Sequence, residues 1–136
     1  MRYLVDRGVL TVSIGGDDGI TTPVLRGLDP LNDVTVIQID AHMDWKNERF
    51  GQKDGYSSPM RRASEMAHIS GIHQIGIRSY GSATGQDLKD AKDWGAKIYL
   101  AKDIHEKGIE LFLKELTEAG KFFITLDVDG LSLIHI

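Results

Sequence analysis

The stretch that most constrains the fold of this chain is residues 34–44, which read VTVIQIDAHMD. Its first part, Val34–Ile39, is almost purely apolar and rich in β-branched residues. Strands that are buried on both faces have this composition, and they occur in parallel sheets that helices cover on both sides. We therefore expect an interior strand here, in a fold of the α/β class.

Three side chains that can bind a metal end this stretch, namely Asp40, His42 and Asp44. They are spaced two residues apart, and in extended backbone such residues point to the same side. We therefore expect two carboxylates and one imidazole to converge just past the end of the strand. In open α/β sheets, ligands bind at that position.

The remaining chain alternates strand-like and helix-like segments. Further strands are predicted at Val9–Ile14, Ile72–Ile77, Ala96–Ala101 and Phe122–Leu126. Helices are predicted after a cap at Thr21 or Thr22, after a cap at Ser57 or Ser58 and up to Gly71, over Gly85–Trp94, and from Ile109 to Leu116. Connections of helix length between successive strands imply a parallel sheet covered on both faces.

Acidic residues follow three of the five expected strands. They are Asp17 and Asp18 after the first, Asp40 and Asp44 with His42 after the second, and Asp127 and Asp129 after the fifth. Taken singly, each motif is more typical of a solvated turn or a helix cap. Together they favour a shared metal site, because carboxylates crowded into one crevice raise each other's pKa unless cations neutralise them.

The types of side chain in this predicted site limit which metal ions it can bind. Carboxylates with an imidazole and no thiolate suit Mn, Mg, Fe or Ni better than structural zinc. Enough ligands are present for two ions, and a pair of ions would lower the pKa of water bound between them.

Composition limits the class of partner. The net charge is −4, which argues against nucleic acid because no basic excess is available to neutralise phosphates. The absence of cysteine excludes disulfides and is compatible with a reducing cytosol, so we expect a cytoplasmic location. No apolar run approaches the roughly 20 residues that cross a bilayer, so we expect no membrane partner.

The end of the chain looks unlike the rest. Residues 131–136, LSLIHI, directly follow the site-like sequence DVDG, and they match a translation of a common sequencing adaptor. We expect residues 1–130 to form a partial domain and residues 131–136 to be a non-native tail.

Five motifs carry a family resemblance. They are Gly15-Gly16-Asp17, Asp40-Ala41-His42-Met43-Asp44, Tyr56–Ala63 (YSSPMRRA), Gly76-Ile77-Arg78-Ser79 and Thr125–Gly130 (TLDVDG). In this order they resemble the ureohydrolase superfamily of arginases and agmatinases, with the agmatinase branch more similar. The resemblance implies a partial arginase-like fold of three layers, α/β/α, and a binuclear manganese centre. It also implies hydrolysis of a guanidino C–N bond to give urea and an amine.

The resemblance assigns roles by position. Asp40 and Asp127 would bridge two Mn²⁺ ions, His42 would bind one ion and Asp44 the other, and Asp129 would complete the shell of the second ion. Asp44 would also accept a hydrogen bond from the attacking hydroxide, which makes it the candidate catalytic residue. Ni²⁺ or another divalent metal is the alternative to Mn²⁺.

Two positions depart from the family pattern. The family usually has Gly-Gly-Asp-His, with the His as a metal ligand, and here that position is Asp18. A carboxylate can replace imidazole on Mn but adds negative charge. The family also has a His between the Tyr-Ser and Pro-Met-Arg elements, where this chain has Ser57 and Ser58. We place both serines at the substrate, although serine cannot shuttle protons near neutral pH.

These expectations leave three functions open. The first is an agmatinase-like hydrolase of a small guanidino-type substrate, which we expect to be a homo-oligomer when intact. The second is hydrolysis of a formimino or amidine C–N bond on the same scaffold. The third, suggested by Asp18 and Ser58, is a metal-binding pseudoenzyme or regulatory subunit.

Overall fold

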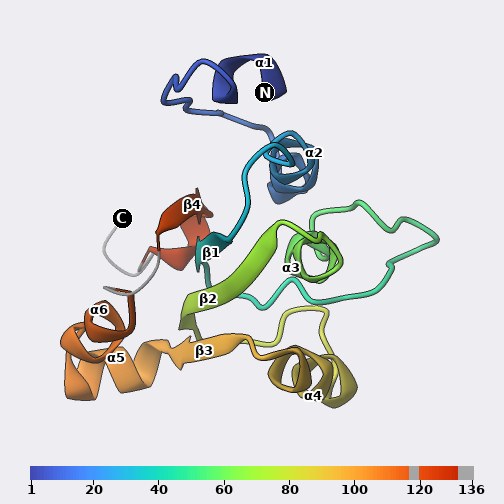
Figure 1. Ribbon diagram of the computed structural model, residues 1–136. Helices are drawn as coiled ribbons and strands as arrows, with labels where there is room; N and C mark the ends of the chain where they lie inside the picture. Colours follow the sequence, from blue (N-terminus) through green and yellow to red (C-terminus); the bar gives the residue numbers. More distant parts are fainter. Residues whose placement is uncertain (117–119, 132–136) are drawn as a thin grey trace.

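The computed structural model describes residues 1–116 and 120–131, and its centre is a parallel sheet (Figure 1). Within those residues the sheet has four strands, β1 (Val34–Ile39), β2 (Ile69–Ile77), β3 (Lys97–Leu100) and β4 (Lys121–Leu126). Their order is β3-β2-β1-β4, and every neighbouring pair is parallel. The central position of β1 confirms the interior strand expected from its composition.

Helices lie on both sides of the sheet, which gives three layers (Figure 1). They are α1 (Arg2–Val5), α2 (Thr21–Arg26), α3 (Pro59–Ser64), α4 (Gly85–Trp94), α5 (Ala101–Lys107) and α6 (Glu110–Leu116), with short 3₁₀ turns η1 (Asp18–Ile20) and η2 (Val128–Gly130). One face of β1, with Val34 and Val36, packs against α2, α3 and α4. The other face, with Ile37, packs against α5 and α6. This alternation confirms that β1 is buried on both faces, as its composition predicted.

The strand predicted at Val9–Ile14 is absent from the structure. Leu10, Val12 and Ile14 are 93%, 83% and 92% exposed, so their apolar row faces solvent. A strand forms only where a neighbour accepts its backbone hydrogen bonds, and no described strand lies beside this segment. Ile124 in the edge strand β4 is similarly exposed, at 62%.

Several element boundaries differ from expectation, and one helix was not expected. Strand β2 begins at Ile69, so Gly71 lies inside it and does not end the preceding helix, which stops at Ser64. A Cβ at position 71 would lie 3.2 Å from Oγ1 of Thr35, so this glycine allows β1 and β2 to approach closely. Helix α5 was not predicted, because its polar sequence lacks an apolar stripe.

The predicted helix caps also differ. Helix α2 begins at Thr21 itself, after a 3₁₀ turn that the side chain of Asp17 caps. Ser58 does occupy the cap position of α3, with Pro59 at the first turn as expected, but its hydroxyl makes no capping bond. The carbonyl of Asp44 instead accepts the N–H groups of Met60 (3.1 Å) and Arg61 (3.4 Å). The capping group therefore comes from a distant loop, which local sequence cannot show.

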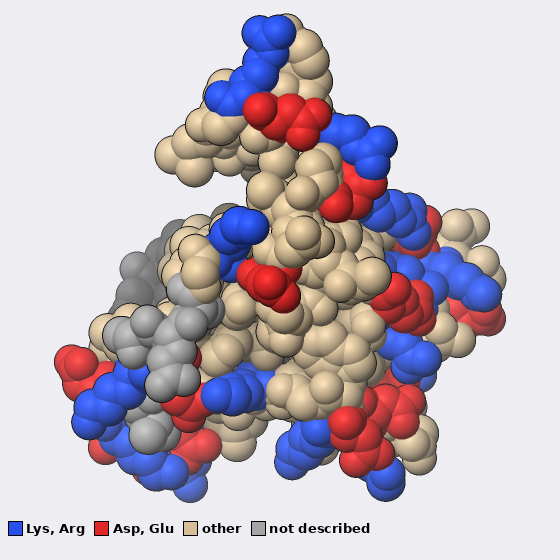
Figure 2. Space-filling view, in the orientation of Figure 1, with Lys and Arg blue, Asp and Glu red and all other residues tan. Residues whose placement is uncertain are grey.

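The surface carries both signs of charge. Figure 2 shows Lys and Arg side chains next to Asp and Glu side chains over the visible face, and ion pairs such as Arg26–Asp54 (2.8 Å) join them. Among the described residues, no helix is long and apolar enough to cross a bilayer. Of the predicted tail, residues 132–136 lie outside the described residues, so the division at residue 130 stays a prediction.

Candidate metal centre

The carboxyl end of β1 meets the carboxyl end of β4. The two strands pair in parallel from Val34 opposite Lys121 to Ile39 opposite Leu126, so the residues that follow them emerge side by side. The amide N–H of Ala41 donates to Oδ1 of Asp129 at 3.1 Å. Nδ1 of His42 lies 3.0 Å from Oδ2 of Asp129. Residues almost 90 positions apart are thereby joined at one edge of the sheet.

Two groups of possible metal ligands form there, and they share one carboxylate. Asp40, His42 and Asp129 make one group, and Asp18, Asp40 and Asp44 make the other. Within each group the ligand atoms lie within 4.8 Å of one another. Asp40 is almost fully buried, at 1% exposed, and it is the common member. A carboxylate has two oxygens, so Asp40 is placed where it can bridge two ions.

The other predicted ligand, Asp127, stands slightly apart. Its Oδ1 accepts the N–H of Asp129 at 2.9 Å, and it belongs to neither group. Its charge nevertheless reaches Asp18, whose pKa it raises. The bridging role of Asp127 therefore stays a prediction, as do the individual roles of the other ligands.

Burial raises the pKa of three carboxyl groups in the cluster. The pKa of Asp18 rises from 3.8 to about 6, first because burial removes water from the carboxylate and next because the charge of Asp40 is near. Burial likewise raises the pKa of Asp40. It raises the pKa of Asp44 to about 10, with the charge of Asp40 as the next cause. The three groups would ionise together only if positive charge were supplied.

One atom of the cluster is also left without a partner. Oδ1 of Asp18 accepts the hydroxyl of Thr21 at 3.1 Å, whereas its Oδ2 is buried and has no hydrogen-bond partner among the described residues. A buried acceptor without a donor is costly, and a cation would satisfy it. The orphaned oxygen and the carboxylate-imidazole donor set therefore fit divalent cations, including at the position where the resemblance expected histidine.

Close backbone approach is needed to assemble these loops. A Cβ at Gly130 would lie 2.8 Å from the backbone nitrogen of Asp40, so only glycine fits there. Asp44 itself has a positive φ of 45°, a conformation that Asp tolerates better than most residues. This conformation occurs where the carbonyl of Asp44 caps α3, so the same residue serves both the helix and the acidic cluster.

Sequence reasoning missed the residues that support the ligands. Gln38 donates hydrogen bonds to Asp40 and Asp44, and Gln74 donates to Gln38. Arg78 donates to the backbone carbonyls of Asp129, Gly130 and Leu131, which fixes the loop after β4. The available signal was a glutamine near the carboxyl end of each of two mainly apolar strands.

The serines predicted at the substrate are buried. Ser57 and Ser58 are 2% and 0% exposed, and Oγ of Ser58 has no hydrogen-bond partner within the described part of the chain. Their role at the substrate stays a prediction.

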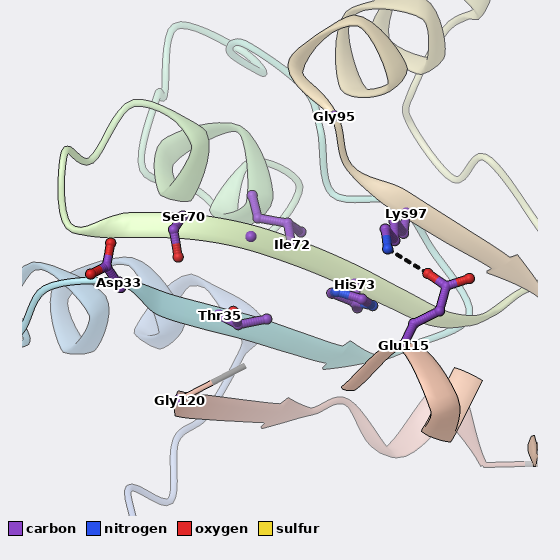
Figure 3. Close-up of a pocket in the computed structure, with 10 residues that line it drawn as sticks. Asp33, Thr35, Ser70, Ile72, His73, Gly95, Lys97, Glu115 and Gly120 are labelled. Atoms are coloured by element: carbon purple, nitrogen blue, oxygen red, sulfur yellow. Dashed lines mark hydrogen bonds and ion pairs between the residues drawn. The ribbon is translucent and has the colours of Figure 1, made fainter. Parts of the chain in front are cut away.

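A separate pocket of about 370 Å³ lies at the opposite end of the sheet (Figure 3). Thr35 and His73 line it beside the ion pair of Lys97 with Glu115 (2.5 Å). The hydroxyl of Tyr99 donates to the same Glu115 at 2.8 Å and lies 3.3 Å from Nδ1 of His73. The ionisable groups of this pocket bind one another through these contacts. We therefore place the candidate site at the acidic cluster, where Oδ2 of Asp18 has no hydrogen-bond partner among the described residues.

Comparison with known proteins decides the family. The family model described as "Arginase family" matches residues 1–135. The chain belongs to the arginase family. A solved relative is the agmatine ureohydrolase of Thermoplasma volcanium, which is 25% identical and superposes with a TM-score of 0.84 over 96% of this chain and 43% of its own.

Other arginase-family relatives bear different substrate names. The guanidinobutyrase of Pseudomonas aeruginosa is 29% identical over 134 residues, which are 94% of this chain and 42% of that protein. The formimidoylglutamase structure from Bacillus subtilis is 28% identical, with a TM-score of 0.80 over 93% of this chain and 42% of its own. The chain thus spans less than half the length of these relatives. The family and the fold expected from the motifs are confirmed, and the substrate remains open.

Proposed function

We propose that the protein hydrolyses the C–N bond of a small guanidino compound and releases urea and an amine. The observation that carries the proposal is the pair of ligand groups that share Asp40. Similarity to an agmatine ureohydrolase and to a guanidinobutyrase supports the guanidino substrate. As partners we propose this substrate and further copies of the chain, but neither nucleic acid nor a membrane.

Each residue has a chemical task under this proposal. Asp40 would hold two cations with Asp18 and Asp44 on one side and His42 and Asp129 on the other. When bound, divalent cations such as Mn²⁺ or Ni²⁺ ionise the carboxylates, activate water and stabilise developing negative charge. Asp44 would orient the attacking water by accepting its hydrogen bond, and the acidic cluster would attract a guanidinium group. The water oxygen forms a bond to the guanidino carbon, the bond from that carbon to the amine nitrogen breaks, and the two protons of the water pass to that nitrogen, so that urea and a protonated amine are released.

The formimidoylglutamase relative favours a second candidate, hydrolysis of a formimino C–N bond. Both reactions add water to a planar carbon bonded to nitrogen, so the same cluster would serve either. The products differ, because a formimino substrate gives formamide or ammonia and not urea.

The test is a product assay with full-length protein loaded with Mn²⁺ or Ni²⁺. A panel of guanidino and formimino compounds is incubated, and urea, formamide and ammonia are measured. Urea release that Asp44→Asn abolishes supports the proposal, whereas formamide or ammonia supports the second candidate. Bound metal without any product would refute both and favour a pseudoenzyme.

A further inference from the structure

Two glutamines lie side by side beneath the acidic cluster. Gln38 of β1 and Gln74 of β2 are paired in register, and both are 0% exposed. A buried amide costs free energy unless its polar atoms are hydrogen-bonded. A fully buried pair of them on two neighbouring strands therefore calls for an explanation other than packing.

A backbone carbonyl fixes the orientation of both amides. Nε2 of Gln74 donates to the carbonyl of Met43 at 2.5 Å and to Oε1 of Gln38 at 2.6 Å. The carbonyl only accepts, so the NH₂ group of Gln74 must face it, and the other hydrogen of that NH₂ goes to Gln38. With its oxygen engaged in this way, Gln38 has to present its own NH₂ group on the other side.

That NH₂ group spans two carboxylates. Nε2 of Gln38 donates to Oδ2 of Asp40 at 2.8 Å and to Oδ2 of Asp44 at 2.9 Å. Both hydrogens are used, and one uncharged donor holds two carboxyl groups at a fixed separation. The arrangement has a cost, because Oε1 of Gln74 is buried and has no partner among the described residues. Flipping Gln74 would bring that oxygen against two acceptors, which is worse.

From this geometry we propose that Gln38 is a positioning residue that presets Asp40 and Asp44 for divalent cations, and that Gln74 orients it. This role of Gln38 rests on the proposed function in one respect, namely that the acidic cluster binds divalent cations. Partners of this kind around metal ligands typically contribute 10–100-fold to metal affinity. Gln38 donates only to Oδ2 of each of these two carboxyl groups, so it does not occupy Oδ1 of either.

The test is Mn²⁺ titration of the chain by calorimetry, with wild type, Gln38→Leu, Gln38→Glu and Gln74→Leu. We expect Gln38→Leu to weaken Mn²⁺ binding about 10–100-fold. Gln38→Glu should also weaken it, because a carboxyl side chain has no NH₂ group that can hold Asp40 and Asp44 together. Gln74→Leu should have a smaller effect, since Gln38 keeps its bonds but loses its fixed orientation. Thr35→Val is the matched control, because Thr35 is buried in β1 but lines the pocket at the opposite end of the sheet.

A second readout uses no metal. In ¹⁵N NMR spectra of the metal-free chain, the side-chain amide of Gln38 should exchange slowly in wild type and in Thr35→Val and faster in Gln74→Leu. The proposal is overturned if Gln38→Leu binds Mn²⁺ as Thr35→Val does, or if wild type binds none. Failure of the proposed function is a separate result, because it would appear as tight Mn²⁺ binding without product in the full-length protein.

Discussion

Replacing Asp18 with asparagine should stabilise the metal-free protein at neutral pH and destabilise its metal complex. The substitution keeps the shape of the side chain and the acceptor for the Thr21 hydroxyl. It removes a carboxylate that burial and the charge of Asp40 make hard to ionise. The asparagine NH₂ group would also point toward the two neighbouring carboxyl groups and can donate to them.

The magnitude follows from the pKa of Asp18, which is about 6 in the folded chain against 3.8 as its ordinary value. A raised pKa means that the folded chain holds this proton more tightly than the unfolded chain. Its contribution to stability is complete below pH 3.8 and is lost as the pH rises to about 6. A shift of about two pKa units corresponds to about 3 kcal/mol. Above pH 6 the metal-free wild type therefore carries a cost of up to about 3 kcal/mol that the Asp18→Asn variant lacks.

The assay is urea denaturation at pH 4 and pH 8, in EDTA and with added Mn²⁺. Without metal we expect Asp18→Asn to match wild type at pH 4 and to exceed it at pH 8. With Mn²⁺ the order should reverse, because only wild type offers the charged ligand. Asp17→Asn is the control, since Asp17 caps η1 and lies outside the ligand groups. Equal losses of stability at both pH values without metal would refute the reasoning.

Two further substitutions test how the cluster is assembled. Gly130→Ala places a Cβ 2.8 Å from the nitrogen of Asp40, so we expect a loss of about 1–3 kcal/mol in the free energy of unfolding and weaker Mn²⁺ binding; unchanged binding would contradict the close approach. Thr21→Val removes a hydroxyl that donates to Asp18 and lies 3.0 Å from that of Thr125, so thermal or urea unfolding should show a loss of about 1–3 kcal/mol. A value within error of wild type would mean that this buried contact carries no stability.

The local sequence pattern predicted secondary structure correctly where a single strand or helix packs its apolar residues against the core. The apolar run of β1 and the 10-residue helix α4 were predicted with their observed bounds. It failed at Val9–Ile14, because alternating apolar residues make a strand only beside another strand. It also failed at Ser58, where a carbonyl from another loop performs the capping that the local motif suggested.

The sequence alone determined the family, the parallel sheet and the acids that end its strands, because buried β-branched runs and short-range spacing are properties of neighbouring residues. Only the tertiary structure decided that Asp40 is shared by two ligand groups and that Asp129 reaches it from β4. It also decided that the amides of Gln38 and Gln74 connect the core to that cluster. The physical reason is that strand order and register, which no local pattern encodes, set which distant side chains come within hydrogen-bonding distance.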